Sequence, residues 1–272
     1  MSFKKNIALV LGAGAGVAIG KAIKDKKICP LCVAKKAVAY TQVHVQDTEK
    51  YNNGVALTPP MGWSSWNTFR NTIDEAYEGI LNNPTVCYVG ADARQSGTFQ
   101  GEIVAELPDH GDINGDGKIS YVMIEGDPEN IDAQYRTEYS IKALTDAGYE
   151  VECLDDQVGN WDQTKGQELA ANALTQYGDA VEVIFCNNDA MALGAAAAIT
   201  AAGRTVGEDI YLLGVDALDE CVEMVNNGTM TGTVLNDHIG QSHTAVDVAI
   251  KALNGEKIDN YYWVDYVKVT KQ

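Results

Sequence analysis

The sequence predicts an α/β fold in which a mostly parallel sheet carries helices on both faces. From Thr85 onward, short apolar runs alternate with stretches of helical pattern, which is typical of βαβ units. Polar residues stand directly after several of the apolar runs, where strands end. The 272 residues are 46% hydrophobic and 21% charged, as expected of a globular chain that buries a core.

The predicted elements follow one another in regular order. The strands are TVCYVGAD, ISYVMIEG, YEVECLDD, VEVIFCNN, IYLLGVD and GTVL. The helices begin near Gln95, Asp132, Gln163, Ala190, Leu218 and Ser242. The closing segment YYWVDYVKV alternates in the manner of a strand, so residues 259–272 form a terminal strand.

Six residues that suit ligand binding come just after predicted strands: Asp92, Asp132, Trp161, Asn188, Asp216 and Asn236. Open α/β sheets bind ligands at the carboxyl ends of their strands. We therefore expect these side chains to converge on one edge of the sheet. Taken singly, Asp132 could be a helix N-cap, Asn188 a helix-entry residue and Trp161 a core residue.

Charge divides the chain into two unequal parts. Residues 1–40 hold eight Lys and one acid, Asp25, whereas the whole chain has 20 basic and 38 acidic residues and a net charge of -18. This balance argues against a nucleic-acid partner, because phosphate contacts need clustered Lys and Arg. The apolar run 7–19 after a Lys pair predicts a secretory signal or a short membrane anchor, with a Gly/Ala-rich surface helix as the alternative.

The cysteines give a weaker signal. Cys29 and Cys32 form a single CxxC, which suits a redox pair or half a metal site. Cys87, Cys153 and Cys186 lie in strand-like runs and are expected to be small buried hydrophobes. Residues 41–84 are polar and irregular, and we interpret them as a linker.

A loop with calcium-binding spacing precedes the second predicted strand. Positions 1, 3, 5 and 9 of this loop carry oxygen side chains, position 6 is a glycine, and position 7 offers its carbonyl. These residues are Asp112, Asn114, Asp116, Ser120, Gly117 and Lys118. Met123 stands where an EF-hand has its bidentate Glu, so Ca²⁺ would need one more acid from elsewhere. The alternative is a polar turn that binds nothing.

Residues 85–270 resemble the bacterial periplasmic galactose/glucose-binding proteins of ABC transporters and chemotaxis. The resemblance rests on YVGADARQSGTFQG, DINGDGKIS, GDPENIDAQYRTEY, the NWD around Trp161, VIFCNNDAMALGAAAA, GVDAL and GTVLND. It implies a type I periplasmic-binding-protein fold with one complete lobe and a truncated second lobe. The complete sugar-binding lobe would span 110–236, and 85–109 with 237–258 would be a remnant of the first lobe.

The same resemblance implies the sites. Glu182 would complete the calcium loop. Sugar hydroxyls would bond to Asp132, Arg136, Asn188, Asp216 and Asn236, with Trp161 stacking on the sugar ring. Asn130 stands where the family usually has His. The implied protein is not an enzyme: it binds galactose or glucose, works with an ABC transporter permease, and is exported to the periplasm or cell surface.

A second, shorter resemblance lies in the amino-terminal part. The segment 54–69, GVALTPPMGWSSWNTF, resembles the start of retaining α-galactosidases of the (β/α)₈ class. Such an enzyme needs roughly 250 residues and two catalytic carboxylates, and no counterpart of those acids follows in the sequence. A fusion of two galactose-related fragments is therefore our interpretation, and a glycoside hydrolase fragment is the alternative function. A sugar-responsive repressor would need a basic helix-turn-helix, which the glycine-rich head lacks.

Overall fold

The computed structural model describes residues 8–11 and 86–271. These residues form two compact units. Among the described residues, unit 1 takes 8–11, 86–91 and 238–264, and unit 2 takes 92–237 and 265–271.

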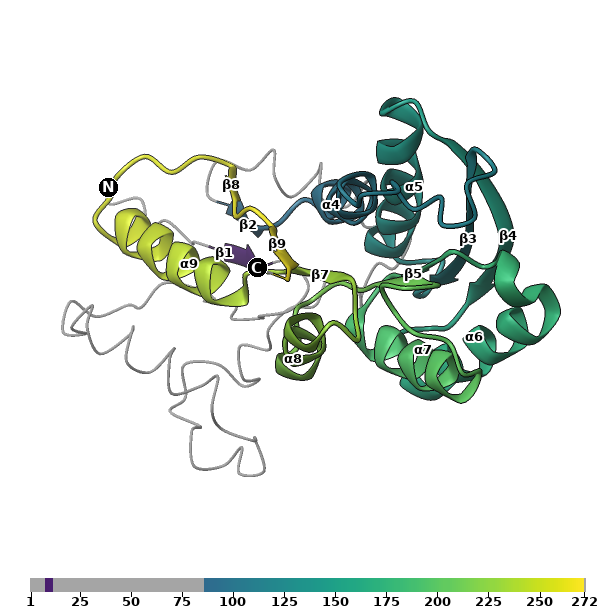
Figure 1. Ribbon diagram of the computed structural model, residues 1–272. Helices are drawn as coiled ribbons and strands as arrows, with labels where there is room; N and C mark the ends of the chain where they lie inside the picture. Colours follow the sequence, from purple (N-terminus) through teal and green to yellow (C-terminus); the bar gives the residue numbers. More distant parts are fainter. Residues whose placement is uncertain (1–7, 12–85, 272) are drawn as a thin grey trace, which may run out of the picture. The chain divides into compact units, whose positions relative to one another are not determined.

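Unit 2 is built on a six-stranded sheet with the order β4-β3-β5-β6-β7-β9 (Figure 1). The strands are β3 (Lys118–Glu125), β4 (Glu150–Val158), β5 (Val183–Cys186), β6 (Tyr211–Leu213), β7 (Gly232–Leu235) and β9 (Val267–Thr270). Neighbours pair in parallel, except that β9 runs antiparallel to β7 and places Val267 opposite Leu235. The carboxyl ends of five strands and the start of β9 therefore share one edge, which we call the carboxyl edge.

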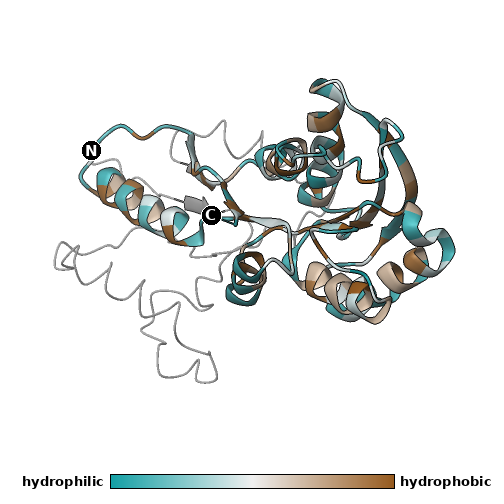
Figure 2. Cartoon of the chain, in the orientation of Figure 1, coloured by the Kyte–Doolittle hydropathy of each residue, from teal (hydrophilic) through white to brown (hydrophobic). Residues whose placement is uncertain are grey.

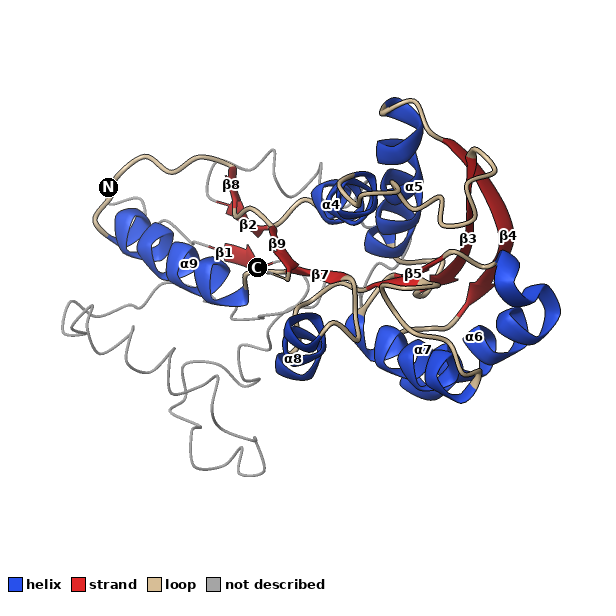
Figure 3. Cartoon of the chain, viewed as in Figure 1, coloured by secondary structure: helices blue, strands red, loops and turns tan. Residues whose placement is uncertain are grey.

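Helices cover both faces of this sheet (Figure 3). Helices α4 (Ala93–Ala105) and α5 (Ile131–Asp146) pack together on one face. Helices α6 (Gln163–Tyr177) and α7 (Asp189–Ala201) pack together on the other, and α8 (Asp219–Asn227) contributes to the same apolar core. A short 3-10 helix, Gly178–Ala180, follows α6. The predicted α/β architecture is thus confirmed.

The sequence determines these elements locally in a consistent way. The interior of β3 is buried on both faces, as expected of a central parallel strand with helices above and below. Four helices of unit 2 have an N-cap residue whose side chain accepts a hydrogen bond from a backbone N–H in the first turn of the helix. These N-cap residues are Asp92, Asn130, Asp162 and Asn188. Helix α7 is apolar over most of its length (Figure 2), in keeping with its buried position.

Helix α4 packs unusually close to α5 because two of its residues are glycines. A Cβ on Gly101 would lie 2.2 Å from the carbonyl oxygen of Ser140, and one on Gly97 would lie 2.8 Å from two α5 carbonyls. This contact makes residues 92–109 part of unit 2, whereas the sequence-based boundary grouped 85–109 with the other lobe. The structure draws the other boundary at 264/265 instead of 258/259.

Unit 1 contains a three-stranded parallel sheet with the order β1-β2-β8. Its strands are β1 (Ala8–Leu11), β2 (Val86–Gly90) and β8 (Tyr261–Trp263), and among the described residues of this unit the helix is α9 (His238–Leu253). Cys87 and Val89 of β2 pack against Ala245 and Val248 of α9.

Several expectations need revision in detail. The single terminal strand predicted over 259–272 is two strands, β8 in unit 1 and β9 in unit 2, because the chain passes between units after Val264. Helix α9 begins at His238 rather than near Ser242. Of the strand cysteines, Cys153 is exposed, whereas Cys87 and Cys186 are buried as expected.

Apart from residues 8–11, which form β1 within the apolar run 7–19, the predicted head segments lie outside the described residues. They are the signal or anchor within 1–40 with Cys29 and Cys32, the linker 41–84, and the α-galactosidase-like stretch 54–69. In the described part of the chain, no helix combines the length and apolarity needed to cross a membrane.

Candidate functional site

The carboxyl edge of unit 2 gathers polar side chains from several elements. Asp132 and Arg136 lie one turn apart on α5, after β3. Asn188 follows β5, and Asp216 follows β6. Trp161 follows β4, Asn236 follows β7 and is half-buried, and Tyr266 directly precedes β9.

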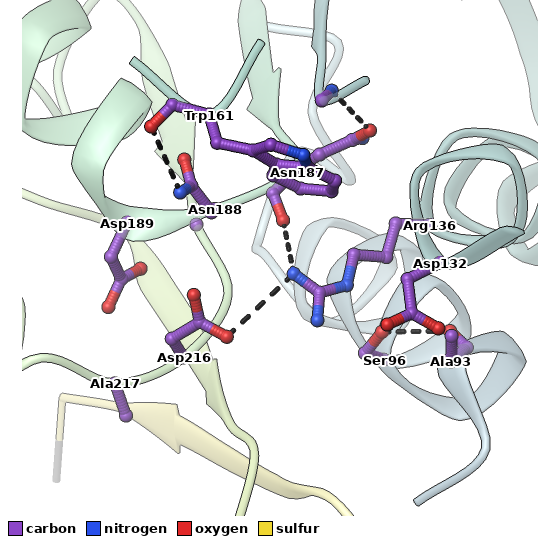
Figure 4. A network of polar contacts seen from close by, with 12 residues as sticks. Ala93, Ser96, Asp132, Arg136, Trp161, Asn187, Asn188, Asp189, Asp216 and Ala217 are labelled. Carbon is purple, nitrogen blue, oxygen red and sulfur yellow. Dashed lines mark hydrogen bonds and ion pairs between the residues drawn. The ribbon is translucent and has the colours of Figure 1, made fainter. Parts of the chain in front are cut away.

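Arg136 is the centre of this arrangement (Figure 4). The side chain is only 5% exposed, and its Nη1 donates to the carbonyl oxygen of Asn187 at 2.7 Å. The same Nη1 lies 3.7 Å from Oδ1 of Asp216, and Nη2 lies 3.5 Å from the hydroxyl of Tyr266. The Nε of Arg136 is buried and has no hydrogen-bond partner among the described residues. A buried donor of this kind is expected to bind a further group.

The charges at the carboxyl edge are strongly coupled. Burial alone would lower the pKa of Arg136, but Tyr266, Asp216 and Asp132 outweigh burial and raise it, so Arg136 stays cationic. Burial raises the pKa of Asp216 to about 6; Arg136 opposes this shift, and the nearby carboxylates of Asp189 and Asp132 add to it. Burial also raises the pKa of Asp132, again against the effect of Arg136.

Trp161 is held in a conformation that non-glycine residues rarely adopt. Its φ is 66°, and that of Asn160 is 51°. The indole ring lies directly on Gly126, where a Cβ would come within 2.2 Å of Cη2 and Cζ2 of Trp161. Nδ2 of Asn188 donates to the Trp161 carbonyl at 3.4 Å, and the Arg136 guanidinium lies 5.7 Å from the ring centroid. Figure 4 shows this guanidinium between the indole ring and the Asp216 carboxylate.

Two of the predicted sugar-binding asparagines, Asn130 and Asn188, also cap helices. Oδ1 of Asn188 accepts from the backbone N–H of Met191 at 3.0 Å, and Oδ1 of Asn130 accepts from that of Asp132 at 2.9 Å. The N-cap of α5 is therefore Asn130, and Asp132 occupies the first turn. In each asparagine the amide nitrogen still provides donors.

One of the six residues predicted to converge comes from a different sheet. Asp92 follows β2, which belongs to the three-stranded sheet of unit 1. Asp92 itself caps α4 by accepting from the backbone N–H of Arg94 at 3.0 Å. Its carboxylate nevertheless adds to the raised pKa of Asp132, so Asp92 lies within electrostatic reach of the site.

Sequence reasoning did not identify three residues that shape this edge. Asn187 is fully buried, and its Oδ1 accepts from the backbone N–H of Gly126 at 2.9 Å, which joins the ends of β5 and β3. The position of Asn187 directly after an apolar strand was a usable signal. Gly126 and Tyr266 carried no comparable signal, because their importance depends on contacts with residues distant in sequence.

The predicted calcium loop folds around its acidic side chains. Oδ1 of Asp112 accepts from Gly115 N at 2.8 Å, and Oδ2 accepts from Gly117 N at 2.9 Å. Glu182, 1% exposed, reaches the loop: Oε1 accepts from Asn114 N at 2.9 Å and Oε2 from Ser120 N at 2.8 Å. The remaining predicted ligands, Asp116 and Lys118, lie on the exposed side of the loop and at the start of β3. Among the described residues, no three His, Cys, Asp or Glu side chains form a cluster able to hold a metal.

Comparison with known proteins identifies the class of protein that this fold and site define. Residues 71–257 match the periplasmic binding protein domain, and the chain therefore belongs to that family. The type I fold of this family agrees with the architecture of unit 2.

Relatives make the comparison more specific. The chain is 36% identical over 187 residues to the D-galactose/methyl-galactoside binding periplasmic protein MglB of Haemophilus influenzae. It is 30% identical over 189 residues to the ribose import binding protein RbsB of Escherichia coli. A crystal structure of a periplasmic solute-binding protein from Actinobacillus succinogenes with bound D-allose superposes with a TM-score of 0.60 at 27% identity, covering 68% of this chain and 62% of that one.

The chain spans little more than half the length of these curated relatives. The matched region is 67% of this chain but 55% of the galactose-binding protein, and 69% of this chain but 59% of the ribose-binding protein.

Proposed function

We propose that this protein binds a neutral monosaccharide, as the solute-binding component of an ABC sugar transporter. The observation that carries the proposal is Arg136, a buried cation that lies between the Trp161 ring and the Asp216 carboxylate and whose Nε has no partner in the described part of the chain. Sugars present vicinal hydroxyl groups beside an apolar C–H face. The Arg136 guanidinium and the Asp216 carboxylate suit the hydroxyl groups, and the Trp161 ring suits the C–H face.

Each side chain would have a distinct part in binding. The carboxylates of Asp132 and Asp216 would accept hydrogen bonds from sugar hydroxyls, and the guanidinium of Arg136 would donate to a hydroxyl or ring oxygen. The amides of Asn130, Asn188 and Asn236 both donate and accept. The Trp161 ring would cover the C–H face of the sugar.

We propose D-galactose or D-glucose as the sugar, because of the galactose-family motifs and the relative named for galactose. Other relatives are named for ribose or hold allose, so the test compares all four sugars. Titration calorimetry of the full chain is expected to show saturable binding, with galactose or glucose strongest. Arg136→Met should abolish binding, whereas Lys142→Met, an exposed change on the same helix, should leave it intact. Absence of binding by any of the four sugars at millimolar concentration contradicts the proposal.

We further propose that Ca²⁺ stabilises unit 2 at the loop around Asp112. The donors are of the type that a hard cation prefers: oxygen atoms from Asp112, Asn114, Asp116 and Glu182, the Lys118 carbonyl, and the hydroxyl of Ser120. In the described part of the chain these carboxylates are not gathered into a cluster, so Ca²⁺ binding would have to draw them together. Glu182 is a buried carboxylate whose oxygens accept two backbone N–H groups of the loop and which forms no salt bridge among the described residues, so its negative charge remains available to a cation. Calcium is expected to raise the thermal unfolding temperature, and Asp116→Ala should remove both the rise and the calorimetric binding signal. Equal unfolding temperatures with calcium and with a chelator would contradict the site.

Export and a permease partner belong to the same proposal. The protein would act in the periplasm or at the cell surface and deliver its sugar to an ABC transporter permease. Cell fractionation tests the location. Recovery of labelled sugar uptake in cells that lack their own binding protein tests the partner, and a sugar-binding chain that fails to restore uptake would contradict it.

A glycoside hydrolase fragment is the second candidate function, favoured only by the α-galactosidase-like stretch 54–69. Incubation with an aryl α-galactoside distinguishes the two functions. We expect no hydrolysis, and catalytic release of the phenol would favour the hydrolase.

A further inference from the structure

Two consecutive residues after β6 have an unfavourable backbone conformation. Asp216 has a φ of 116° and Ala217 a φ of 54°, and neither is glycine. Such conformations cost about 1–3 kcal/mol per residue and persist only where neighbouring groups enforce them. Because the Asp216 carboxylate faces Arg136, the groups that enforce this backbone also set the position of a residue of the candidate site.

Asp189, at the first position of α7, is placed to hold this turn. Its side chain is completely buried, with 0% exposure. Oδ2 of Asp189 accepts from the backbone N–H of Leu218 at 2.7 Å, directly after the two strained residues. The backbone N–H of Asp189 donates to the carbonyl of Val215 at 2.8 Å, directly before them. Asp189 therefore fixes the chain on both sides of Asp216 and Ala217.

Thr233 on β7 links Asp189 to the same turn. Its hydroxyl donates to Oδ1 of Asp189 at 2.7 Å and lies 3.4 Å from the backbone nitrogen of Ala217, from which it accepts. Gly214 makes the arrangement possible, because a Cβ there would lie 2.2 Å from Oδ1 of Asp189. The Asp189 carboxylate thus occupies a space that any side chain at position 214 would fill.

We propose that Asp189 and Thr233 are positioning residues that hold the left-handed turn at Asp216–Ala217, so that the Asp216 carboxylate faces Arg136. In this proposal neither Asp189 nor Thr233 contacts the sugar; both act through the turn. When the turn is released, Asp216 and Ala217 relax toward ordinary backbone angles, and only a fraction of the molecules keeps a binding-competent site. The apparent affinity for ligand falls by that fraction. The affinity test rests on the proposed sugar binding, whereas the turn itself can be tested without any ligand.

The first experiment measures amide hydrogen exchange at Ala217 and Leu218 in the full chain without sugar. Thr233→Val keeps the side-chain shape but removes the hydroxyl that accepts from the Ala217 amide. Asp189→Ala removes the two carboxylate oxygens that accept from the Leu218 amide and from the Thr233 hydroxyl. Both variants are expected to exchange these two amides at least tenfold faster, while Thr233→Ser should keep the native rate. Asp209→Asn, a carboxylate change in the distant 204–209 loop, serves as the control for general destabilisation. Unchanged exchange at both amides in Thr233→Val overturns the proposal.

The second experiment measures affinity for the best-binding sugar of the panel. Thr233→Val should weaken binding about tenfold, the order expected when a buried charged group loses one partner. In an Asp216→Ala background the same change should alter affinity less than twofold, because its effect passes through Asp216. Adding Ala217→Gly to Thr233→Val should recover several-fold affinity, since glycine adopts a φ near +54° without steric cost.

The two experiments separate the two proposals. If the native chain binds no sugar and the Thr233→Val variant loses amide protection at Ala217 and Leu218, sugar binding is refuted and the positioning role stands. If the chain binds sugar and Thr233→Val weakens binding equally with and without Asp216, the positioning role is refuted.

Discussion

Replacing Gly126 with alanine tests how the site positions its aromatic ring. The new methyl carbon would lie 2.2 Å from Cη2 and Cζ2 of Trp161, whereas ordinary contact begins at 3.4 Å. To restore ordinary contact the indole ring would have to move away by about 1.2 Å, the difference between these two distances, and side chains packed around the ring oppose such a shift. Overpacking of this size costs about 1–3 kcal/mol. We expect urea unfolding of Gly126→Ala to show a loss in that range, together with weaker sugar binding.

A double-mutant cycle with Trp161→Ala isolates this contact. Once the ring is removed, the methyl group meets none of the atoms that crowd it, and alanine in place of glycine stabilises a compatible backbone by about 0.4–1 kcal/mol. Gly126→Ala should therefore be neutral or slightly stabilising in the Trp161→Ala background. An equal cost in both backgrounds, or a cost below about 0.5 kcal/mol in the native background, would refute the packing argument.

Four further predictions rest on the described contacts. Since the pKa of Asp216 is about 6, sugar affinity should fall as pH drops from about 7 to about 5, and Asp216→Asn should flatten this dependence. Because the pKa of Asp216 is raised, the folded protein binds more protons than the unfolded protein between about pH 4 and 6. The contribution of Asp216 to the free energy of unfolding should therefore rise as pH falls through about 6. Urea unfolding of the native chain and of Asp216→Asn measures this difference. Gly101→Ala should destabilise unit 2 by about 1–3 kcal/mol in urea unfolding, because its methyl meets the Ser140 backbone, and a near-neutral result would contradict the close α4–α5 contact. Asp112→Asn should weaken calcium binding at least tenfold by calorimetry, and unchanged affinity would exclude Asp112 as a ligand.

Most of the fold was predictable because its signals are local. The buried run of β3, KISYVMIE, is apolar on both faces, and the regular spacing of strands and helices predicted parallel pairing. Sheet membership was not predictable in the same way. Strand β2 pairs with β8, far away in the sequence, so the local pattern near Asp92 does not indicate a different sheet; only the family resemblance placed residues 85–90 in another lobe. The alternation over 259–272 likewise gave no sign of the passage between units after Val264.

The candidate site shows the same division between local and distant information. Asp132, Trp161, Asn188 and Asp216 follow strand ends and could be identified one at a time. The residues that hold them could not: Gly126 matters through the Trp161 ring and Asn187, and Asp189 through Leu218 and a threonine on β7. Their roles depend on packing between elements, which a single sequence does not display.

Strand β9 has a consequence for the order in which unit 2 acquires its structure. Residues 265–270 leave the ribosome after every other element of that unit, yet they pair with β7 and bring Tyr266 to Arg136, 130 positions earlier in the chain. Contacts of such high sequence separation form slowly. Until they form, β7 is an open strand edge, and the nascent chain is exposed to mispairing and aggregation at that edge. Newly made unit 2 would therefore depend on prompt docking of residues 265–270, or on chaperone protection until they dock.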